Sequence, residues 1–182
     1  VTGASAGIGK AIAIACSQMG GMVILNGRNQ ERLKKTLQEL SGEGHQIISA
    51  DLSMEKDRTR LIDNLPKLDG LVQCAGVGSR VPCKMIGKDD LEHVFVPNVE
   101  APILLQTELL AKKKINKSSS IVFIASKAAS FPSIGNAAYS ASKGAIISYA
   151  KCLALELAPR QIRVNCICPA MVWTDLILQG GI

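Results

Sequence analysis

The chain has 182 residues, of which 47% are apolar and 20% are charged, and this composition is typical of a folded globular domain rather than a disordered segment. Only 3% of the residues are aromatic, which argues against the stacking surfaces that bind single-stranded nucleic acid. The formal net charge of +6 suits an anionic small molecule or cofactor. No apolar stretch approaches the roughly 18 residues of a membrane-spanning helix, so we expect neither a nucleic-acid partner nor a membrane span.

The densest basic cluster follows an apolar helical pattern. Cations at that place stabilise the C-terminus of a helix, so we interpret the cluster as a solvated helix end and not as a nucleic-acid patch. It consists of Lys112, Lys113, Lys114 and Lys117.

The six cysteines include no Cys-x-x-Cys pair, and neither His45 nor His93 lies near a cysteine cluster. A metal site is therefore not expected. We interpret the cysteines as small buried side chains in a reducing compartment. No signal-peptide pattern opens the sequence, and the expected location is the cytoplasm.

Apolar runs of strand length alternate with helical patterns along the chain. This alternation predicts a doubly wound α/β fold of the Rossmann type, a parallel sheet with helices on both faces in three layers. Such sheets bind ligands at the carboxyl ends of their strands. The expected strands are residues 23–26, 46–50, 70–75, 121–125 and 163–168, and the expected helices are 10–19, 31–40, a segment containing Leu61, Ile62 and Leu65, 89–114 and 139–158.

A glycine-rich loop opens the chain and leads into an Ala/Ile-rich helical pattern. Gly3 can form a tight turn out of a strand, Gly7 allows the backbone to approach a pyrophosphate, and Gly9 allows a helix to pack closely. The free N–H groups and the positive end of the following helix then hold the phosphates. The spacing predicts a dinucleotide-binding loop, although a glycine trio alone is also compatible with a simple helix-entry turn.

A second constellation carries proton-transfer chemistry. Tyr139 and Lys143 are four positions apart, so on a helix their side chains share one face. A cationic lysine beside a phenol favours the phenolate and is expected to lower the tyrosine pKa from its reference of about 10. Such a tyrosine can protonate a carbonyl oxygen as hydride arrives, and Ser126 at the end of a predicted strand can reach the same oxygen.

With these motifs in place, the sequence resembles the short-chain dehydrogenase/reductase family over essentially its whole length. The loop matches the pattern Thr-Gly-x-x-x-Gly-x-Gly of that family. The other matching segments are Ala75-Gly76, Asn98, Ser126, Tyr139 with Lys143, Arg163-Val164-Asn165, Pro169 and Thr174.

The resemblance implies a role for each matching residue. It makes Tyr139 the acid/base, Ser126 the group that polarises the substrate, and Lys143 the residue that tunes Tyr139 and binds ribose. Asn98 helps to hold a water that connects the lysine to solvent, and the substrate contacts Ser126 and Tyr139. The implied cofactor-binding residues are Gly3, Ser5, Gly7, Ile8, Gly9, Arg28, Asp51, Leu52, Ala75, Gly76, Tyr139, Lys143, Pro169, Val172 and Thr174.

Two prolines flank Asn98 in the long helical pattern. Pro102 has no N–H to donate to the Asn98 carbonyl four residues earlier. We hypothesise that Pro102 enforces a kink that frees this carbonyl for the water, and a simple helix break is the alternative. The sequence also departs from the family where Gln73-Cys74 replaces two asparagines that brace neighbouring strands, so the brace must differ here.

The end of the second expected strand, Gly27-Arg28, decides the cofactor. An acidic residue there would accept bonds from free ribose hydroxyls, whereas an arginine suits a 2′-phosphate. Because Arg28 is present and no acidic residue is, we expect NADP(H) rather than NAD(H). A solvated loop arginine is the alternative interpretation.

The sequence therefore predicts an NADP-dependent oxidoreductase that interconverts a carbonyl and a secondary alcohol, similar to 3-oxoacyl-carrier-protein reductases. The expected substrate is a small molecule or an acyl group bound to a carrier. A sugar, a steroid-like alcohol and a small ketone are all compatible with the sequence. A dinucleotide-binding sensor or scaffold without turnover is the alternative, against which the intact Ser126, Tyr139 and Lys143 argue. The resemblance also implies a homo-oligomer, with a tetramer favoured.

The domain expected from the motifs spans residues 1–182. Only Val1 precedes the glycine loop, so the start of the first strand is expected to be missing. The resemblance likewise implies a substrate-covering segment and a last strand beyond residue 182.

Overall fold

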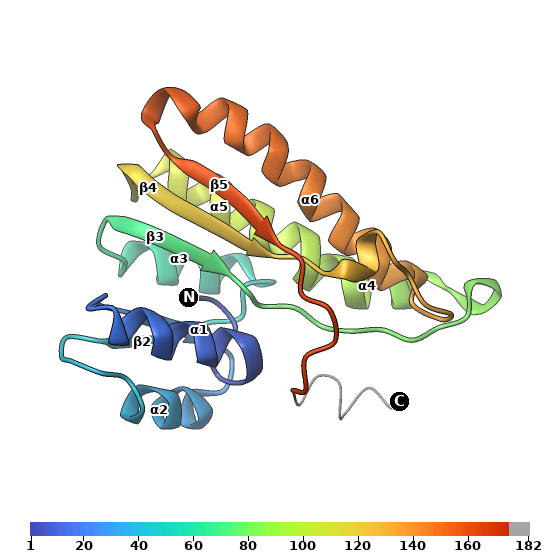
Figure 1. Cartoon of the computed structure of the whole chain (residues 1–182), viewed down its shortest axis with the longest axis horizontal. Coiled ribbons are helices and arrows are strands. Elements are labelled where there is room, and N and C mark those ends of the chain that lie inside the picture. The colour runs from blue at the N-terminus through green and yellow to red at the C-terminus, as the bar shows by residue number, and fades with distance from the viewer. Residues whose placement is uncertain (175–182) are drawn as a thin grey trace.

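The computed structural model describes residues 1–174, in which parallel strands are flanked by helices (Figure 1). The strands are β1 Ile24–Gly27, β2 Gln46–Ser49, β3 Leu68–Gln73, β4 Ile115–Ile124 and β5 Arg163–Ile167. The α-helices are α1 Gly7–Gln18, α2 Gln30–Gln38, α3 Glu55–Asp63, α4 Lys88–Phe95, α5 Ala101–Ala111 and α6 Ala137–Leu157. Short turns of 3-10 helix lie at Cys83–Met85, Lys127–Ala129 and Ala158–Arg160, and a π-helical turn spans Val96–Glu100.

All the strand pairs of the described chain are parallel. β1 pairs with β2, and β4 lies between β3 and β5. The first two residues join these groups, because the Asn26 amide donates to the Val1 carbonyl and the Thr2 amide donates to the Val72 carbonyl, each at 2.9 Å. The order across the molecule is therefore β2, β1, residues 1–2, β3, β4, β5.

Two hydrophobic cores lie on opposite faces of this arrangement. Leu25 belongs to a small core with residues of α1 and α2, whereas its neighbour Ile24 packs against a large core. Because successive side chains of a strand point to opposite faces, the helices cover both. The doubly wound α/β fold predicted from the sequence is confirmed. The large core includes Leu61 and Ile62 of α3, Leu105 and Leu109 of α5, and Ile146 and Leu153 of α6.

The helical region expected over residues 89–114 is interrupted near Asn98, where the prolines predict either a kink or a simple helix break. It is interrupted by the π-helical turn Val96–Glu100, where the Ala101 amide donates to the Val96 carbonyl five residues earlier. Pro97 and Pro102 supply no N–H in this stretch, which removes two bonds of the α-helical ladder. The interruption separates α4 from α5.

β4 is longer than expected and begins at Ile115, directly after the helix end. Lys117 therefore lies in a strand and not at a helix terminus. Of the other lysines in the cluster, Lys112 forms an ion pair with Asp63 at 2.6 Å, and Lys114 donates to the Leu65 carbonyl. The cluster is thus partly engaged in packing α5 and β4 against the chain that follows α3.

The cysteines are less buried than expected. Cys16, Cys74 and Cys166 are half-buried, and Cys83, Cys152 and Cys168 are exposed. None of the six is disulfide-bonded. Within residues 1–174, no cluster of three or more His, Cys, Asp or Glu side chains could hold a metal ion. In that same part of the chain, no helix has the length and apolarity needed to cross a membrane.

Candidate active site

The carboxyl ends of the strands surround a cavity of about 690 Å³. The glycine loop, the turns after β1 to β5, the π-helical turn and the start of α6 all contribute to its lining. Every cofactor-binding and substrate-contacting residue predicted from the sequence lines this cavity, and of the predicted site residues only Asn98 does not. The cavity therefore lies at the carboxyl ends of parallel strands, where such sheets bind ligands.

The glycine loop is held in a conformation that larger residues would disturb. Gly3 and Gly7 have positive φ values of 65° and 52°, which L-residues with a Cβ rarely adopt. A Cβ on Gly9 would lie 2.3 Å from the Gly3 carbonyl oxygen. Helix α1 thus starts in direct contact with the loop that precedes it.

The N-terminus of α1 is open toward the cavity. Its N-cap residue Ala6 offers no side-chain hydrogen bond, and the first turn contains no acidic residue. Gly7, Ile8 and Gly9 line the cavity. The first N–H groups of a helix need acceptors and carry the positive end of its dipole, so this end of the cavity can bind an anionic group such as a pyrophosphate.

The cavity is also lined by the predicted proton-transfer residues. Ser126 follows the end of β4, and its Oγ accepts a hydrogen bond from the Ala128 amide at 3.1 Å. Helix α6 places Tyr139 in its first turn and Lys143 one turn later, with the Lys143 ammonium 5.8 Å from the centre of the Tyr139 ring. The Lys143 ammonium also donates to the Ile124 carbonyl at 2.9 Å. The spacing argument for one shared helix face is consistent with this geometry.

The electrostatics of Tyr139 differ from the expectation. Burial raises its pKa above the ordinary range, and a hydrogen bond with Ser126 lowers it by less. Burial also lowers the pKa of Lys143, while nearby cysteines act in the opposite direction. The predicted lowering of the Tyr139 pKa by Lys143 is therefore wrong for this structure. Sequence spacing gives the distance between the two groups but not their desolvation.

Asn98 lies in the π-helical turn and is only 2% exposed. Its Oδ1 accepts from the Val77 amide at 2.8 Å, and its Nδ2 donates to the Val77 carbonyl at 3.0 Å and to Ser142 Oγ at 3.1 Å. The Ser142 hydroxyl donates to the Tyr139 carbonyl at 2.7 Å. Asn98 therefore ties the segment after β3 to the first turn of α6, behind the cavity wall.

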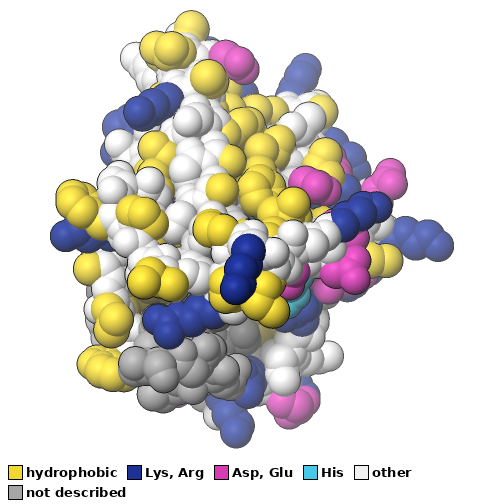
Figure 2. All heavy atoms as spheres, turned by 90° about the vertical axis from the view of Figure 1, so that its right-hand side faces the viewer, with side chains coloured by type: hydrophobic (Ala, Val, Ile, Leu, Met, Phe, Trp, Pro, Cys, Tyr) yellow, Lys and Arg dark blue, Asp and Glu magenta, His cyan; other side chains and the backbone are white. Residues whose placement is uncertain are grey.

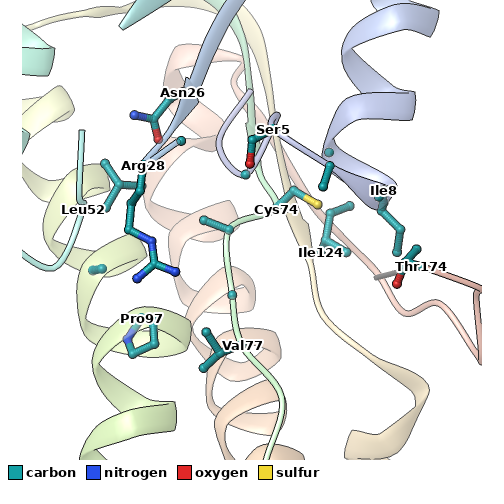
Figure 3. Close-up of a pocket in the computed structure, with 18 of the residues that line it drawn as sticks. Ser5, Ile8, Asn26, Arg28, Leu52, Cys74, Val77, Pro97, Ile124 and Thr174 are labelled. Carbon is teal, nitrogen blue, oxygen red and sulfur yellow. The ribbon is translucent and has the colours of Figure 1, made fainter. Parts of the chain in front are cut away.

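The third region of the cavity surrounds Arg28, which lies beside Leu52 with its guanidinium toward Pro97 (Figure 3). Its side chain is 74% exposed, and its NH1 is 4.0 Å from the Asp51 carboxylate. Arg32, which the sequence reasoning missed, also lines this region. The four-residue spacing from Arg28 and the Asn29 side chain that caps the Arg32 amide are the signals that could have identified it.

The structure also adds Cys74 and His93 to the lining. Cys74 follows β3 directly, and burial raises the pKa of its thiol. A protonated thiol is a weak nucleophile, so Cys74 serves here as a wall residue. His93 comes from α4, whose place over the cavity follows from the tertiary fold and not from a local motif.

A family model described as short chain dehydrogenase matches residues 1–179. The human dehydrogenase/reductase SDR family member 2, mitochondrial, is 32% identical, and the match covers 96% of this chain and 65% of that protein. The 3-oxoacyl-acyl-carrier-protein reductase FabG of Rickettsia felis is 34% identical over 97% of this chain and 73% of its own. The chain thus spans about two thirds of the length of such relatives.

Solved structures of a reductase and a dehydrogenase are also similar to this chain over nearly its whole length. A 3-ketoacyl-acyl-carrier-protein reductase from Brucella melitensis complexed with NADH has a TM-score of 0.88 and 28% identity, and the match covers 98% of this chain and 77% of that one. A serine dehydrogenase complexed with NADP+ has a TM-score of 0.87 and 29% identity, covering 97% of this chain and 73% of that one.

The contact of α1 with the glycine loop can be tested with two matched helical glycines. The change Gly9→Ala places a methyl group against the Gly3 carbonyl, and overpacking of this kind costs about 1–3 kcal/mol of unfolding free energy. Gly144→Ala in α6 meets nothing within 4 Å and should stabilise by about 0.5–1 kcal/mol. Denaturant unfolding measures both, and equal effects of the two substitutions would contradict the close packing.

The raised pKa of Tyr139 can be measured from the absorbance of its phenolate. The change Tyr149→Phe leaves Tyr139 as the sole tyrosine. Its ionisation midpoint should then lie above the value of about 10 found for an unfolded chain, because burial disfavours the charged form. Ser126→Ala should raise the midpoint further, since it removes a bond that lowers the pKa.

Ser140→Ala is the control for that titration, because the Ser140 hydroxyl is buried without a hydrogen-bond partner. It should leave the midpoint in place. A midpoint at or below that of the unfolded chain would show that burial does not govern Tyr139.

Proposed function

The chain belongs to the short-chain dehydrogenase family, and on that premise we propose that it interconverts a carbonyl and a secondary alcohol with NADP(H). One observation carries the proposal: Ser126, Tyr139 and Lys143 line the same cavity as the open N-terminus of helix α1. An anionic dinucleotide and a reacting carbonyl can therefore occupy the same cavity.

The residues present fit a nicotinamide dinucleotide. The open N-terminus of α1 suits the pyrophosphate, and Gly7 lines the cavity where a Cβ would lie 3.3 Å from the Thr174 side chain. Asp51 and Leu52 would hold the adenosine end, while Lys143 would bind the nicotinamide ribose. The other predicted cofactor-binding residues Ala75, Gly76, Pro169, Val172 and Thr174 also line the cavity. When bound, the dinucleotide supplies or takes up the hydride.

Tyr139 then moves the proton. Its raised pKa keeps the phenol protonated at neutral pH, so it can donate a proton to a carbonyl oxygen during reduction. Ser126 orients that oxygen by a second hydrogen bond. Lys143 lies close enough to stabilise the phenolate that remains, since its ammonium is 5.8 Å from the phenol ring centre. Asn98 fixes the start of α6 through Ser142.

Arg28 and Arg32 support NADP(H) as the preferred form. Both line the adenosine end of the cavity, where Gly27 stands in place of an acidic residue. Arginine side chains can bind the oxygens of a 2′-phosphate with two parallel hydrogen bonds. The Asp51 carboxylate, which also lines the cavity, is 4.0 Å from Arg28 NH1.

The loops beside Ser126 and Tyr139 support an acyl substrate on an anionic carrier. Residues 77–87, 125–136 and 168–174 contain no Asp or Glu but include Arg80, Lys84 and Lys127. Figure 2 shows hydrophobic side chains gathered on this side of the molecule with basic groups among them. The large exposed apolar side chains in these loops are Met85, Phe131, Ile134, Met171, Val172 and Trp173.

Two further proposals concern the cellular setting. The free state of the six cysteines supports a reducing compartment such as the cytoplasm. Exposed Leu104 on α5 and Leu155 on α6 support a homo-oligomer, with a tetramer favoured, in which these helices are covered.

Carbonyl reduction is tested by the loss of NADPH absorbance with a panel of 3-oxoacyl thioesters, sugars, steroid-like ketones and small ketones. The change Tyr139→Phe should lower kcat by about 10²- to 10⁴-fold, the usual contribution of a general acid. Tyr149→Phe is the matched control, since that ring packs edge-on against Phe123 in the core. Binding of NADPH without turnover of any carbonyl would instead favour a sensor or scaffold.

Cofactor preference is tested with Arg28→Asp. The change removes charged hydrogen bonds worth about 1.5–3 kcal/mol, so the Kd for NADPH should rise roughly 10- to 150-fold while that for NADH stays constant or falls. Lys35→Asp, on exposed α2 and outside the cavity, makes the same change in net charge. Unchanged affinity for NADPH in Arg28→Asp would refute the assignment.

A further inference from the structure

The side chain of Gln73 joins the end of β3 to the first turn of α5. Gln73 is the last residue of the strand and only 5% exposed, and its Nε2 donates to the Pro102 carbonyl at 3.1 Å. Pro102 is itself buried. This bond links the strand that enters the cavity wall to a helix 29 positions further along the chain, and it is the brace that stands where the family has an asparagine.

The place where the brace attaches is weakly held by its own backbone. The π-helical turn Val96–Glu100 precedes α5 directly, and neither Pro97 in this turn nor Pro102 in the first turn of α5 can donate a backbone hydrogen bond. The Asn98 carbonyl in particular lacks the partner that an α-helix would give it at Pro102. A turn with missing ladder bonds needs contacts from outside to keep one geometry.

Two such contacts exist, one made by Asn98 within the turn and one made at Pro102 just after it. Asn98 bonds to both backbone groups of Val77 and to Ser142, and Gln73 bonds to Pro102. Both contacts start from the same short stretch of chain at the end of β3. Through Ser142 and the Tyr139 carbonyl, the position of the π-helical turn is coupled to the first turn of α6.

We propose that Gln73 is a positioning residue for the proton-transfer site. Its bond to Pro102 holds the π-helical turn against β3 and so places Asn98 between the segment after β3 and the turn of α6 that carries Tyr139. Its effect on turnover rests on the proposed reductase function, whereas its effect on Asn98 is a property of the free protein.

The test uses two buried glutamines that differ in one hydrogen bond, because Gln73 Nε2 donates to Pro102 while Gln73 Oε1 and both polar atoms of Gln106 have no partner. The change Gln73→Met keeps the length of the side chain and removes its donor. Gln106→Met makes the same change one turn along α5, where the side chain is fully buried and neither of its polar atoms has a partner. Gln106→Met should therefore leave turnover unchanged and leave or raise the melting temperature.

Two readouts distinguish positioning from packing. In Gln73→Met, kcat should fall roughly 2- to 30-fold, the range of couplings carried through packed side chains, with KM unchanged and the midpoint of the kcat pH profile displaced. Hydrogen exchange at the Val77 amide, which donates to Asn98, should become faster in the free protein. Neither change should occur in Gln106→Met.

Unchanged Val77 exchange together with an unchanged pH midpoint in Gln73→Met would overturn the proposal, even if the melting temperature fell. If the wild-type chain reduces no carbonyl, the proposed function fails on its own, and Val77 exchange alone decides the role of Gln73. If Gln73→Met does not fold, Gln73→Asn replaces it, because the shorter amide remains polar but cannot reach Pro102 in the same way.

Discussion

The candidate site depends on how the backbone is hydrogen-bonded just beyond β3. The backbone N–H and C=O groups of this segment have no neighbouring strand and must form hydrogen bonds with other parts of the chain. The Thr2 hydroxyl accepts from the amides of Cys74 and Ala75 at 3.0 and 3.1 Å, and Asn98 pairs with both backbone groups of Val77. The glycine loop and the π-helical turn are thereby both fixed to residues 74–77. All four of these residues line the cavity.

Burial shifts the pKa values of the ionisable groups at the site more than their neighbours do. Tyr139 has its pKa raised and Lys143 has its pKa lowered, each mainly by desolvation. Both shifts favour the neutral form, and the Lys143 ammonium is supported by the Ile124 carbonyl. A phenol that holds its proton at neutral pH is suited to act as an acid toward a carbonyl oxygen.

Local sequence patterns predicted the geometry where a short motif by itself determines a backbone conformation or the spacing of two side chains. The positive φ values of Gly3 and Gly7 and the one-turn spacing of Tyr139 and Lys143 follow from such patterns. Patterns failed where the outcome depends on distant parts of the chain. The raised pKa of Tyr139 reflects burial by the whole fold, and Arg32 reaches the cavity only because α2 follows β1. The prolines predicted an interruption of the helix near Asn98 but not its π-helical form. The catalytic and cofactor roles remain predictions, and so does the extent of the domain.

The central claim is that one cavity brings a hydride donor and a carbonyl together beside Tyr139. The most direct measurement uses NADPH deuterated at the ring carbon that donates hydride, followed by mass spectrometry of the alcohol product. We predict one deuterium on the former carbonyl carbon in the wild type, and a strongly slowed formation of the same labelled product in Tyr139→Phe. Alcohol formed without the label, or label released only to solvent, would contradict direct transfer in this cavity.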